Sequence, residues 1–347
     1  MHLSIVIPAL NEATALPPLL QQLRAQQDIE FEIIVVDGGS TDSTVEIAQL
    51  AGAQIVTAPR GRGRQMNAGA ANACGEFLLF LHADSQLESS SLLATALNTL
   101  CEEIARSGQK NIAGHFPLRF VDGDARAARF YRHVEGKTRL NRPYTINGDQ
   151  GLLINTEFFK KLGGFDERLP FLEDQRIATK IFTQGRWIVL PGKLLTSARR
   201  FEIEGRRERY TLMAMLMGLH VANVKEFFAQ APTVYATHSE SGHLPLQAFV
   251  SLIRKIFWQR GFFQTLAILY RIGQFVRENA WQLAYWRDQV HDAVHLPRLR
   301  FYDRWLHPLT RNPLADIVAT ALVSLWFFVM LPQQLRHSGS IQTGGIS

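Results

Sequence analysis

The sequence predicts an α/β fold in which helices flank a mixed, mostly parallel sheet, followed by a helical extension. Three observations lead to this prediction. Short, continuously apolar runs alternate with segments of helical period over residues 3–82, a pattern typical of strands buried on both faces of a parallel sheet. Turn-forming or acidic residues end several of these runs. From about residue 203, only long helical patterns with apolar faces remain.

The expected elements follow one another without an internal repeat or a low-complexity tract. Strands are expected, in chain order, at residues 3–7, 32–36, 53–57, 77–82, 112–120 and 187–190. Helices are expected at 13–27, 43–52, 64–74 and 90–106, and another opens with the segment "LEDQRIATKIF". The last third is expected to be helical over 208–230, 245–257, 262–290 and 314–331.

Composition separates the chain into a neutral part and a basic part. Hydrophobic residues make up 46% of the 347 residues, which supports a real core, and two cysteines give no disulfide framework. Between Arg254 and Arg311, ten Lys/Arg stand against four Asp/Glu, a local excess that equals the net charge of +6, and five of six tryptophans follow residue 254. Such a surface suits an anionic membrane. Nucleic acid is not an expected partner, because no binding module is recognisable.

Carboxylates follow two of the expected strands and open one helix. Asp37 follows "EIIVV", Asp84 follows "FLLFLHA", and Glu173 with Asp174 begins a helix. Because the carboxyl ends of parallel strands share one edge of a sheet, we expect these groups at a common ligand site. Acidic groups along one edge suit a nucleoside diphosphate held through Mg²⁺ or Mn²⁺. Taken singly, each carboxylate also fits a helix N-cap or a turn.

Six segments in a fixed order resemble the family 2 glycosyltransferases, which have the GT-A fold. These are "SIVIPALNE", "IIVVDGGSTDST", "GRGRQMNAGA", "FLLFLHADS", "GDQGLLI" and "LEDQR", and the resemblance covers residues 3 to about 200. It implies an inverting, metal-dependent transfer of a sugar from a nucleotide-sugar to a hydroxyl acceptor. A UDP-sugar is expected rather than a GDP-sugar, and the acceptor is expected to be lipid-linked or an envelope glycan. The "HADS" and "GDQG" segments are similar to those of small bacterial members.

The resemblance implies a nucleotide-binding role for side chains at the ends of the early strands and on the helix that follows. Asp37 would accept hydrogen bonds from the base. Arg62 and Arg64 lie in a glycine-rich loop that suits phosphates; a solvated basic loop is the alternative. The implied nucleotide-binding residues are Pro8, Ala9, Glu12, Asp37, Arg62, Arg64, Asn67 and Asp84.

Asp84 is also the metal ligand that the resemblance implies. Most relatives carry Asp-x-Asp at this strand end, whereas His82 stands at the first acidic position here. His82 either binds the ion, which Mn²⁺ tolerates better than Mg²⁺, or hydrogen-bonds a phosphate. In the second case, which we favour, Asp84 is the sole protein ligand, with diphosphate and water completing the shell.

The resemblance assigns the catalytic base to Asp174, with Glu173 supporting it or touching the acceptor. An inverting transferase needs one carboxylate to deprotonate the acceptor hydroxyl, and helix capping is the plainer alternative. Asp149 and Gln150 of "NGDQG" are expected to reach the acceptor or the donor sugar, unless this segment is only a turn. The same group includes Arg199 and Arg200, which would clamp the diphosphate or else be surface charges.

Two domains are expected: a GT-A catalytic domain at residues 1–203 and a helical, basic-aromatic extension at 204–347. The first residues, "MHLSIVIPALNE", lack the basic region of a signal peptide. The protein is therefore expected in the cytoplasm, with its extension on the inner face of the cell membrane. Residues 317–331 are uncharged but number only fifteen, fewer than the about 20 that a span needs. A helix that lies in the interface or forms a homodimer is preferred to a spanning one.

Two other functions stay open at the level of sequence. One is a catalytically silent GT-A scaffold at the membrane, supported by the histidine at position 82. The other is a sugar nucleotidyltransferase, a class that would place a glycine-rich phosphate loop after the first strand, where this chain has "PALNEAT".

Overall fold

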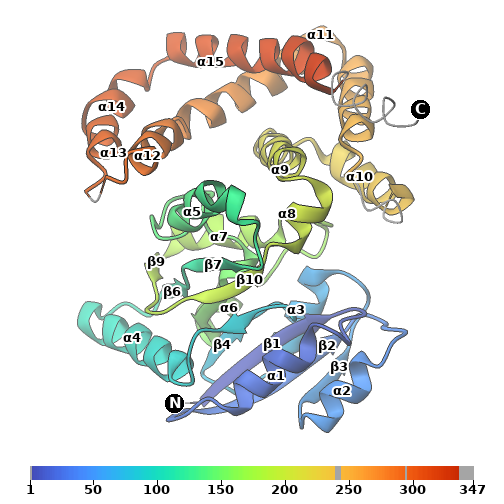
Figure 1. Ribbon diagram of the computed structural model, residues 1–347, viewed down its shortest axis with the longest axis vertical. Coiled ribbons are helices and arrows are strands. Elements are labelled where there is room, and N and C mark those ends of the chain that lie inside the picture. Colours follow the sequence, from blue (N-terminus) through green and yellow to red (C-terminus); the bar gives the residue numbers. More distant parts are fainter. Residues whose placement is uncertain (1, 239–243, 294, 336–347) are drawn as a thin grey trace. The chain divides into compact units, whose positions relative to one another are not determined.

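The computed structural model describes residues 2–238, 244–293 and 295–335 (Figure 1). The chain divides into two compact units, Met1–Arg199 and Arg200–Ser347. Each unit has its own packing, and the two are described separately below.

The first unit is built on a seven-stranded sheet with the order β3-β2-β1-β4-β8-β6-β9. Neighbouring strands are parallel except around β8, which runs antiparallel to both β4 and β6. The predicted mixed, mostly parallel sheet is therefore confirmed. The strands are β1 His2–Ala9, β2 Glu30–Asp37, β3 Gln54–Thr57, β4 Phe77–Phe80, β6 Ile112–His115, β8 Leu152–Asn155 and β9 Arg186–Val189.

A second, three-stranded sheet joins β5 Gln86–Leu87, β10 Leu194–Ser197 and β7 Leu118–Val121 in that order. The single strand expected at residues 112–120 is wrong, because the chain leaves the large sheet after β6 and enters the small one at β7. Pro117 lies at this break, and a proline has no N–H to donate to a strand ladder. Strands β5, β8 and β10 were not expected, since each has at most four residues, too few to show a diagnostic period.

Helices cover both faces of the large sheet. Alternate residues of β1 point to opposite sides: Ile5 and Ile7 pack with α1 and α4, whereas Val6 packs on the side of α3, α6 and α7. A side chain at Gly69 of α3 would collide with Val6, so this glycine lets α3 lie close to β1. The helices are α1 Leu16–Arg24, α2 Thr44–Leu50, α3 Arg62–Ala71, α4 Leu92–Ser107, α5 Ala128–Lys137, α6 Thr156–Lys161 and α7 Glu173–Gln184.

The second unit is helical throughout its described residues. The helix expected at 208–230 is interrupted at Asn223, whose φ of 57° is left-handed. Gly261, with φ 73° and ψ 178°, kinks α11 between the two helices that the sequence predicts there. The helices are α9 Arg206–Val221, α10 Lys225–His238, α11 Leu246–Glu278, α12 Trp281–Val290, α13 Pro297–Phe301, α14 His307–Thr310 and α15 Pro313–Leu325, while α8 Arg199–Glu204 crosses the boundary between the units.

Helix α15 continues beyond Leu325, so that one helical segment runs over Pro313–Leu335. It has 23 residues; its most apolar 18-residue window has a mean hydropathy of 2.2, and 28% of that window is buried. Within residues 2–238, 244–293 and 295–335, this is the one helix long and apolar enough to cross a membrane, judged by length and composition alone. It is longer than the fifteen residues counted from the sequence, because the helix extends past the uncharged stretch at both ends.

Candidate active site

The loops that follow β1 and β2 are hydrogen-bonded to each other at the carboxyl ends of these strands. Asp37 is buried, and its carboxylate accepts hydrogen bonds from the backbone N–H groups of Gly39 and Ser40, both at 3.0 Å. Asn11, with φ 55°, accepts a 2.8 Å bond from Thr41 N–H across the two loops. These contacts hold Asp37 at a fixed place at the edge of the sheet.

Gln65 reinforces this edge and is a residue that the sequence reasoning missed. Its buried amide Nε2 donates to the backbone oxygens of Ala9 and Val36, each at 2.8 Å. Helix α3 is thereby fastened to the ends of both strands. The available signal was a polar residue on the buried side of the "GRGRQMN" helix. The predicted residues Pro8 and Ala9 are buried in β1, and Glu12 follows in the loop.

The beginning of α3 presents two of the predicted arginines. Arg62 and Arg64 are exposed in the first turn, after Gly61 with φ 141°. Asn67 lies one turn further on, and its side chain bonds the turn before α7: Nδ2 donates to Phe165 O at 3.0 Å and Oδ1 accepts from Phe165 N–H at 2.9 Å. In this structure Asn67 therefore holds a loop, and its contact with a nucleotide stays a prediction.

The structure brings the "HADS" and "NGDQG" segments together. His82 Nδ1 and Asp149 Oδ1 lie 2.9 Å apart. The other nitrogen of this ring, Nε2, faces Gly148, where an added Cβ would lie only 2.7 Å from it. Any larger residue at position 148 would push the imidazole away, so the glycine is required for this arrangement.

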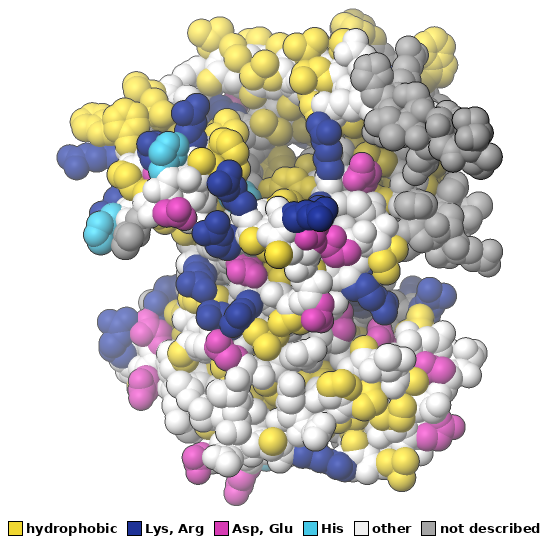
Figure 2. All heavy atoms as spheres, in the orientation of Figure 1, with side chains coloured by type: hydrophobic (Ala, Val, Ile, Leu, Met, Phe, Trp, Pro, Cys, Tyr) yellow, Lys and Arg dark blue, Asp and Glu magenta, His cyan; other side chains and the backbone are white. Residues whose placement is uncertain are grey.

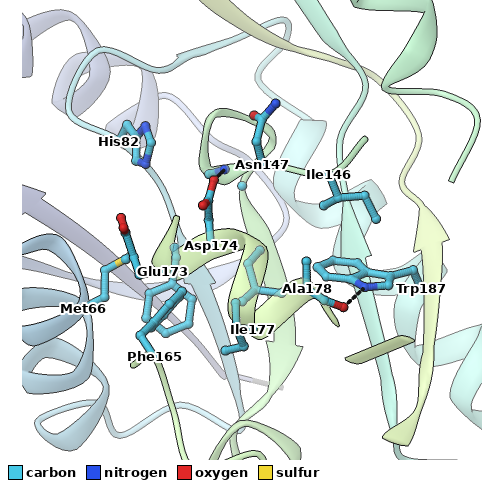
Figure 3. Close-up of a pocket in the computed structure, with 14 residues that line it drawn as sticks. Met66, His82, Ile146, Asn147, Phe165, Glu173, Asp174, Ile177, Ala178 and Trp187 are labelled. Carbon is cyan, nitrogen blue, oxygen red and sulfur yellow. Dashed lines mark hydrogen bonds between the residues drawn. The ribbon is translucent and has the colours of Figure 1, made fainter. Parts of the chain in front are cut away.

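Glu173 and Asp174 begin α7 beside the same loop. Asp174 Oδ2 accepts a 2.7 Å hydrogen bond from Gly148 N–H. Leu172, just before the helix, has φ 65°, an uncommon conformation for a bulky residue and one that often accompanies functional sites. His82, Glu173 and Asp174 point toward a common space (Figure 3).

Glu173 is the most perturbed group of the site. It is 5% exposed. Burial raises the pKa of its carboxyl to about 7, the charge of Asp174 adds to the rise, and the charges of Arg62 and His82 oppose it. Near neutral pH this carboxyl therefore shares its time between the protonated and ionised forms.

The space beneath these groups is small. A cavity of about 30 Å³ is lined by His82, Glu173 and Asp174 together with aromatic side chains that include Phe165 and Trp187. This volume is on the scale of one water molecule. The charged groups therefore lie next to apolar side chains, in a space with little room for water.

Three further predicted residues make none of the contacts described above. Gln150 is fully buried, and its Nε2 donates to Thr145 O at 2.6 Å, so in this structure its side chain supports the loop, and its contact with a sugar stays a prediction. Arg199 and Arg200 are exposed in the first turn of α8. Arg199 ends the first unit and Arg200 begins the second, and their role stays a prediction.

The donor set limits how a divalent ion would be held. Among the residues that the structure describes, no group of three or more His, Cys, Asp or Glu side chains is placed to hold a metal. Asp84 is exposed in the turn after β4, and His82 is engaged by Asp149. One exposed carboxylate fits Mg²⁺ or Mn²⁺ that is bound mainly by diphosphate and water. It does not fit an all-protein cage.

The mostly parallel sheet, with its loops and carboxylates at one edge, agrees with the GT-A fold that the sequence resemblance implies. The family model Glycosyl transferase family 2 matches residues 4–163. The match covers 160 of the 347 residues, and all of them lie in the first unit.

Curated relatives match parts of the chain. A PGL/p-HBAD biosynthesis glycosyltransferase of Mycobacterium tuberculosis is 40% identical over 98 residues, 26% of this chain and 38% of that protein. The 4,4'-diaponeurosporenoate glycosyltransferase of Staphylococcus haemolyticus is 31% identical over 127 residues, 34% of this chain and 32% of that protein. The chain thus spans less than two fifths of the length of these relatives.

Two solved structures are similar at lower identity. Staphylococcus aureus TarS 1–349 in complex with UDP-GlcNAc has 19% identity and a TM-score of 0.48, over 88% of this chain and 92% of that one. The mannosyltransferase PcManGT from Pyrobaculum calidifontis, in complex with GDP-Man and Mn²⁺, has 17% identity and a TM-score of 0.47, over 93% and 87%. The fold assignment rests on the strand order itself.

Proposed function

We propose that the protein is an inverting glycosyltransferase that moves a sugar from a nucleotide-sugar to a hydroxyl acceptor. The match of residues 4–163 to the glycosyltransferase family 2 model supports the reaction class. The observation that carries the proposal is the cluster of His82, Gly148 and Asp174, built from three separate segments at the edge where Asp37 also lies. A catalytically silent scaffold would not need such a group of charged side chains at this edge.

The nucleotide would lie across the ends of β1 and β2. Asp37 keeps acceptor capacity for a base while its own loop holds it in place. The diphosphate would lie at the first turn of α3, where free backbone N–H groups and the side chains of Arg62 and Arg64 favour anions. A UDP-sugar is the expected donor, in keeping with the sequence resemblance.

Asp174 would act as the base. The acceptor oxygen attacks the anomeric carbon, the bond from that carbon to the diphosphate oxygen breaks, and the diphosphate leaves with the electron pair. Asp174 takes the hydroxyl proton, while Gly148 N–H holds its carboxylate in position. A divalent ion at Asp84 would offset the charge of the diphosphate. Arg62 lies close enough to act on Glu173 electrostatically and would add positive charge on the same side.

The second unit would place the enzyme on the inner face of the cell membrane. Trp258 and Phe263, on either side of the kink in α11, are 88% and 84% exposed. Exposed aromatics of this kind are typical of an interfacial helix, and Pro313–Leu335 has the length and hydropathy of an anchor. The acceptor would then be lipid-linked or an envelope glycan. A homodimer through the same apolar helix is the alternative use of this surface.

A panel of UDP-, GDP- and dTDP-sugars, measured by thermal shift with and without Mn²⁺, tests the donor. We expect one UDP-sugar to raise the unfolding temperature more in the presence of Mn²⁺. If no nucleotide stabilises the protein under either condition, the enzyme proposal is wrong.

Asp174→Asn tests the base. The amide keeps an oxygen that can accept from Gly148 N–H, so the loop should remain in place, but the amide cannot take a proton. We expect turnover to fall about 10²- to 10⁴-fold, with the nucleotide-induced thermal shift unchanged. The control is Asp303→Asn, on an exposed residue of the second unit. Full turnover in Asp174→Asn would remove the residue from the mechanism, and nucleotide binding without turnover in the wild type would favour the scaffold.

A further inference from the structure

The second unit encloses an apolar cavity of about 310 Å³ between α9, α11 and the helix that begins with α15. All fourteen lining residues are apolar or glycine, among them Met215 and Leu219 of α9, Ile272 of α11, and Val323 and Trp326 of the last helix. Apolar cavities of this kind stay dry and accept apolar guests, and the volume reaches the lower range of ligand pockets. The lining offers a sugar or a nucleotide no side-chain hydrogen-bonding partner apart from the Trp326 N–H.

Close helix packing at one end frames this cavity. At Gly273 of α11, an added Cβ would lie 2.5 Å from Thr320 Oγ1, so the two helices nearly touch there. Next to this contact, Arg277 Nε donates to the buried Asp316 carboxylate at 2.5 Å. At the other end, the rings of Phe257 and Phe327 meet with centroids 5.6 Å apart. The cavity lies between two fixed contacts and is therefore part of the fold.

The mouth of the cavity opens onto an apolar surface. Two of its lining residues, Leu322 and Val276, are 60% and 42% exposed. The same helix also exposes Leu325, Phe328 and Val329, and Figure 2 shows hydrophobic side chains gathered over this part of the second unit. A guest that entered from water would have to cross this surface, whereas a hydrocarbon chain in a bilayer would meet it directly.

Positive charge accompanies these apolar side chains on α11. The helix carries five Lys/Arg and one acidic residue, Glu278. Arg260 pairs with Glu226 and Arg277 with Asp316. Arg254 and Lys255 are exposed one turn before the exposed Trp258. Basic side chains next to exposed aromatics complement the phosphates of anionic lipids and leave the aromatic rings at the level of the headgroups.

We propose that this cavity binds one acyl chain of an anionic membrane phospholipid, whose headgroup stays outside with the basic residues of α11. The chain would fill the space between α9 and the hairpin of α11 and α15, and would hold the second unit to the bilayer more tightly than surface contact alone. The proposal rests on the membrane placement proposed above and is independent of sugar transfer.

Photolabelling distinguishes a chain inside the cavity from lipid on the surface. The full-length protein is bound to phosphatidylglycerol vesicles that contain a diazirine in the acyl chain, irradiated, and mapped by mass spectrometry. We expect labels on Met215 or Leu219, which are 7% and 2% exposed and line the cavity, in addition to labels on the exposed Phe262 and Phe263. Labels confined to the exposed phenylalanines, or no labelling at all, would overturn the proposal.

Val323→Trp fills the cavity and should reduce labelling of Met215 and Leu219 by about tenfold while labels at Phe262 and Phe263 persist. The matched control is Val329→Trp on the same helix, at a 45% exposed residue outside the lining. Its cavity labels should be unchanged. If Val323→Trp fails to fold, as judged by its thermal unfolding, Val323→Leu should give a smaller reduction in the same direction. Equal cavity labelling in the folded filled variant and its control contradicts the proposal.

A competing isoprenoid tests the kind of chain. Palmitate should displace the cavity label, and farnesol at the same concentration should not. Displacement by farnesol alone would overturn the assignment to an acyl chain. Because labelling needs no donor sugar, an enzyme without measurable transfer can still pass, and an active enzyme can still fail.

Discussion

The two units treat large apolar side chains in opposite ways. Among the residues that the structure describes, Leu50 is the one large hydrophobic residue of the first unit that is exposed. The second unit exposes most of an apolar helix and several aromatics. Polar side chains of the first unit instead form hydrogen bonds that hold the backbone in place, as Gln65 does at the ends of β1 and β2. The first unit thus buries nearly all of its large apolar side chains, whereas the second unit presents an apolar surface of the kind that binds a partner or a membrane.

Among the variants that test this comparison of the two units, Gly148→Ala should have the largest effect. The added Cβ would lie 2.7 Å from His82 Nε2, so the imidazole must move away from the loop that contains Gly148. We expect about a 10²-fold loss in kcat/KM and a loss of about 1–3 kcal/mol in the free energy of unfolding. Kinetics and denaturant unfolding measure the two. In Gly63→Ala, where the added Cβ meets its neighbours at 3.4 Å or more, stability should hardly change, and an equal loss there would contradict the packing argument.

Glu173→Gln should separate stability from activity in the first unit. Burial raises the pKa of Glu173 to about 7 from 4.5, so between these values the folded state binds more protons than the unfolded state. The contribution of Glu173 to the free energy of unfolding should therefore fall as pH rises from about 4.5 to 7, by up to about 3 kcal/mol. The variant should lack this contribution, be more stable at pH 7.5, and transfer sugar more slowly. Unfolding curves across pH check this, and parallel slopes in both proteins would refute it.

His115 should give the opposite pH dependence. It is fully buried, and burial lowers its pKa to about 4 from 6.5. The unfolded state then binds more protons between these values, so the contribution of His115 to the free energy of unfolding should fall by up to about 3 kcal/mol as pH drops from 6.5 to 4. His115→Phe should remove much of this acid loss, while His133, whose pKa burial also lowers to about 4, retains its share. Replacing the exposed His295 with Gln should leave the slope as in wild type.

The smallest effect on folding is expected in the second unit. Phe263→Ser removes an 84% exposed ring, so the free energy of unfolding in solution should change by less than about 0.5 kcal/mol. Binding to anionic vesicles should weaken by about 1–3 kcal/mol, the value of burying such a ring. Vesicle sedimentation measures this. A large loss of stability would mean that the ring packs within the protein, and the contrast between the units would fail.

Sequence reasoning placed Asp37, Asp84 and Glu173 near one edge because the carboxyl ends of parallel strands share that edge in any such sheet. It could not pair His82 with Asp149, since 67 residues separate them and neither residue type requires the other. The same limit applies to Gln65, because the backbone oxygens that accept from its amide, those of Ala9 and Val36, are 56 and 29 residues away in the sequence. The raised pKa of Glu173 depends on burial, which only the packed α7 reveals.

The buried pair of Asp316 and Arg277 sets a condition on how the last helix can be used. Tyr270 and Gln274 also donate to this carboxylate, so detaching the helix from α11 would strand a charge at its first turn, at a cost of about 3–5 kcal/mol. The Pro313–Leu335 segment would therefore not enter a membrane alone, because α11 would have to move with it. The charged pair would then limit the depth to which the two helices enter the bilayer.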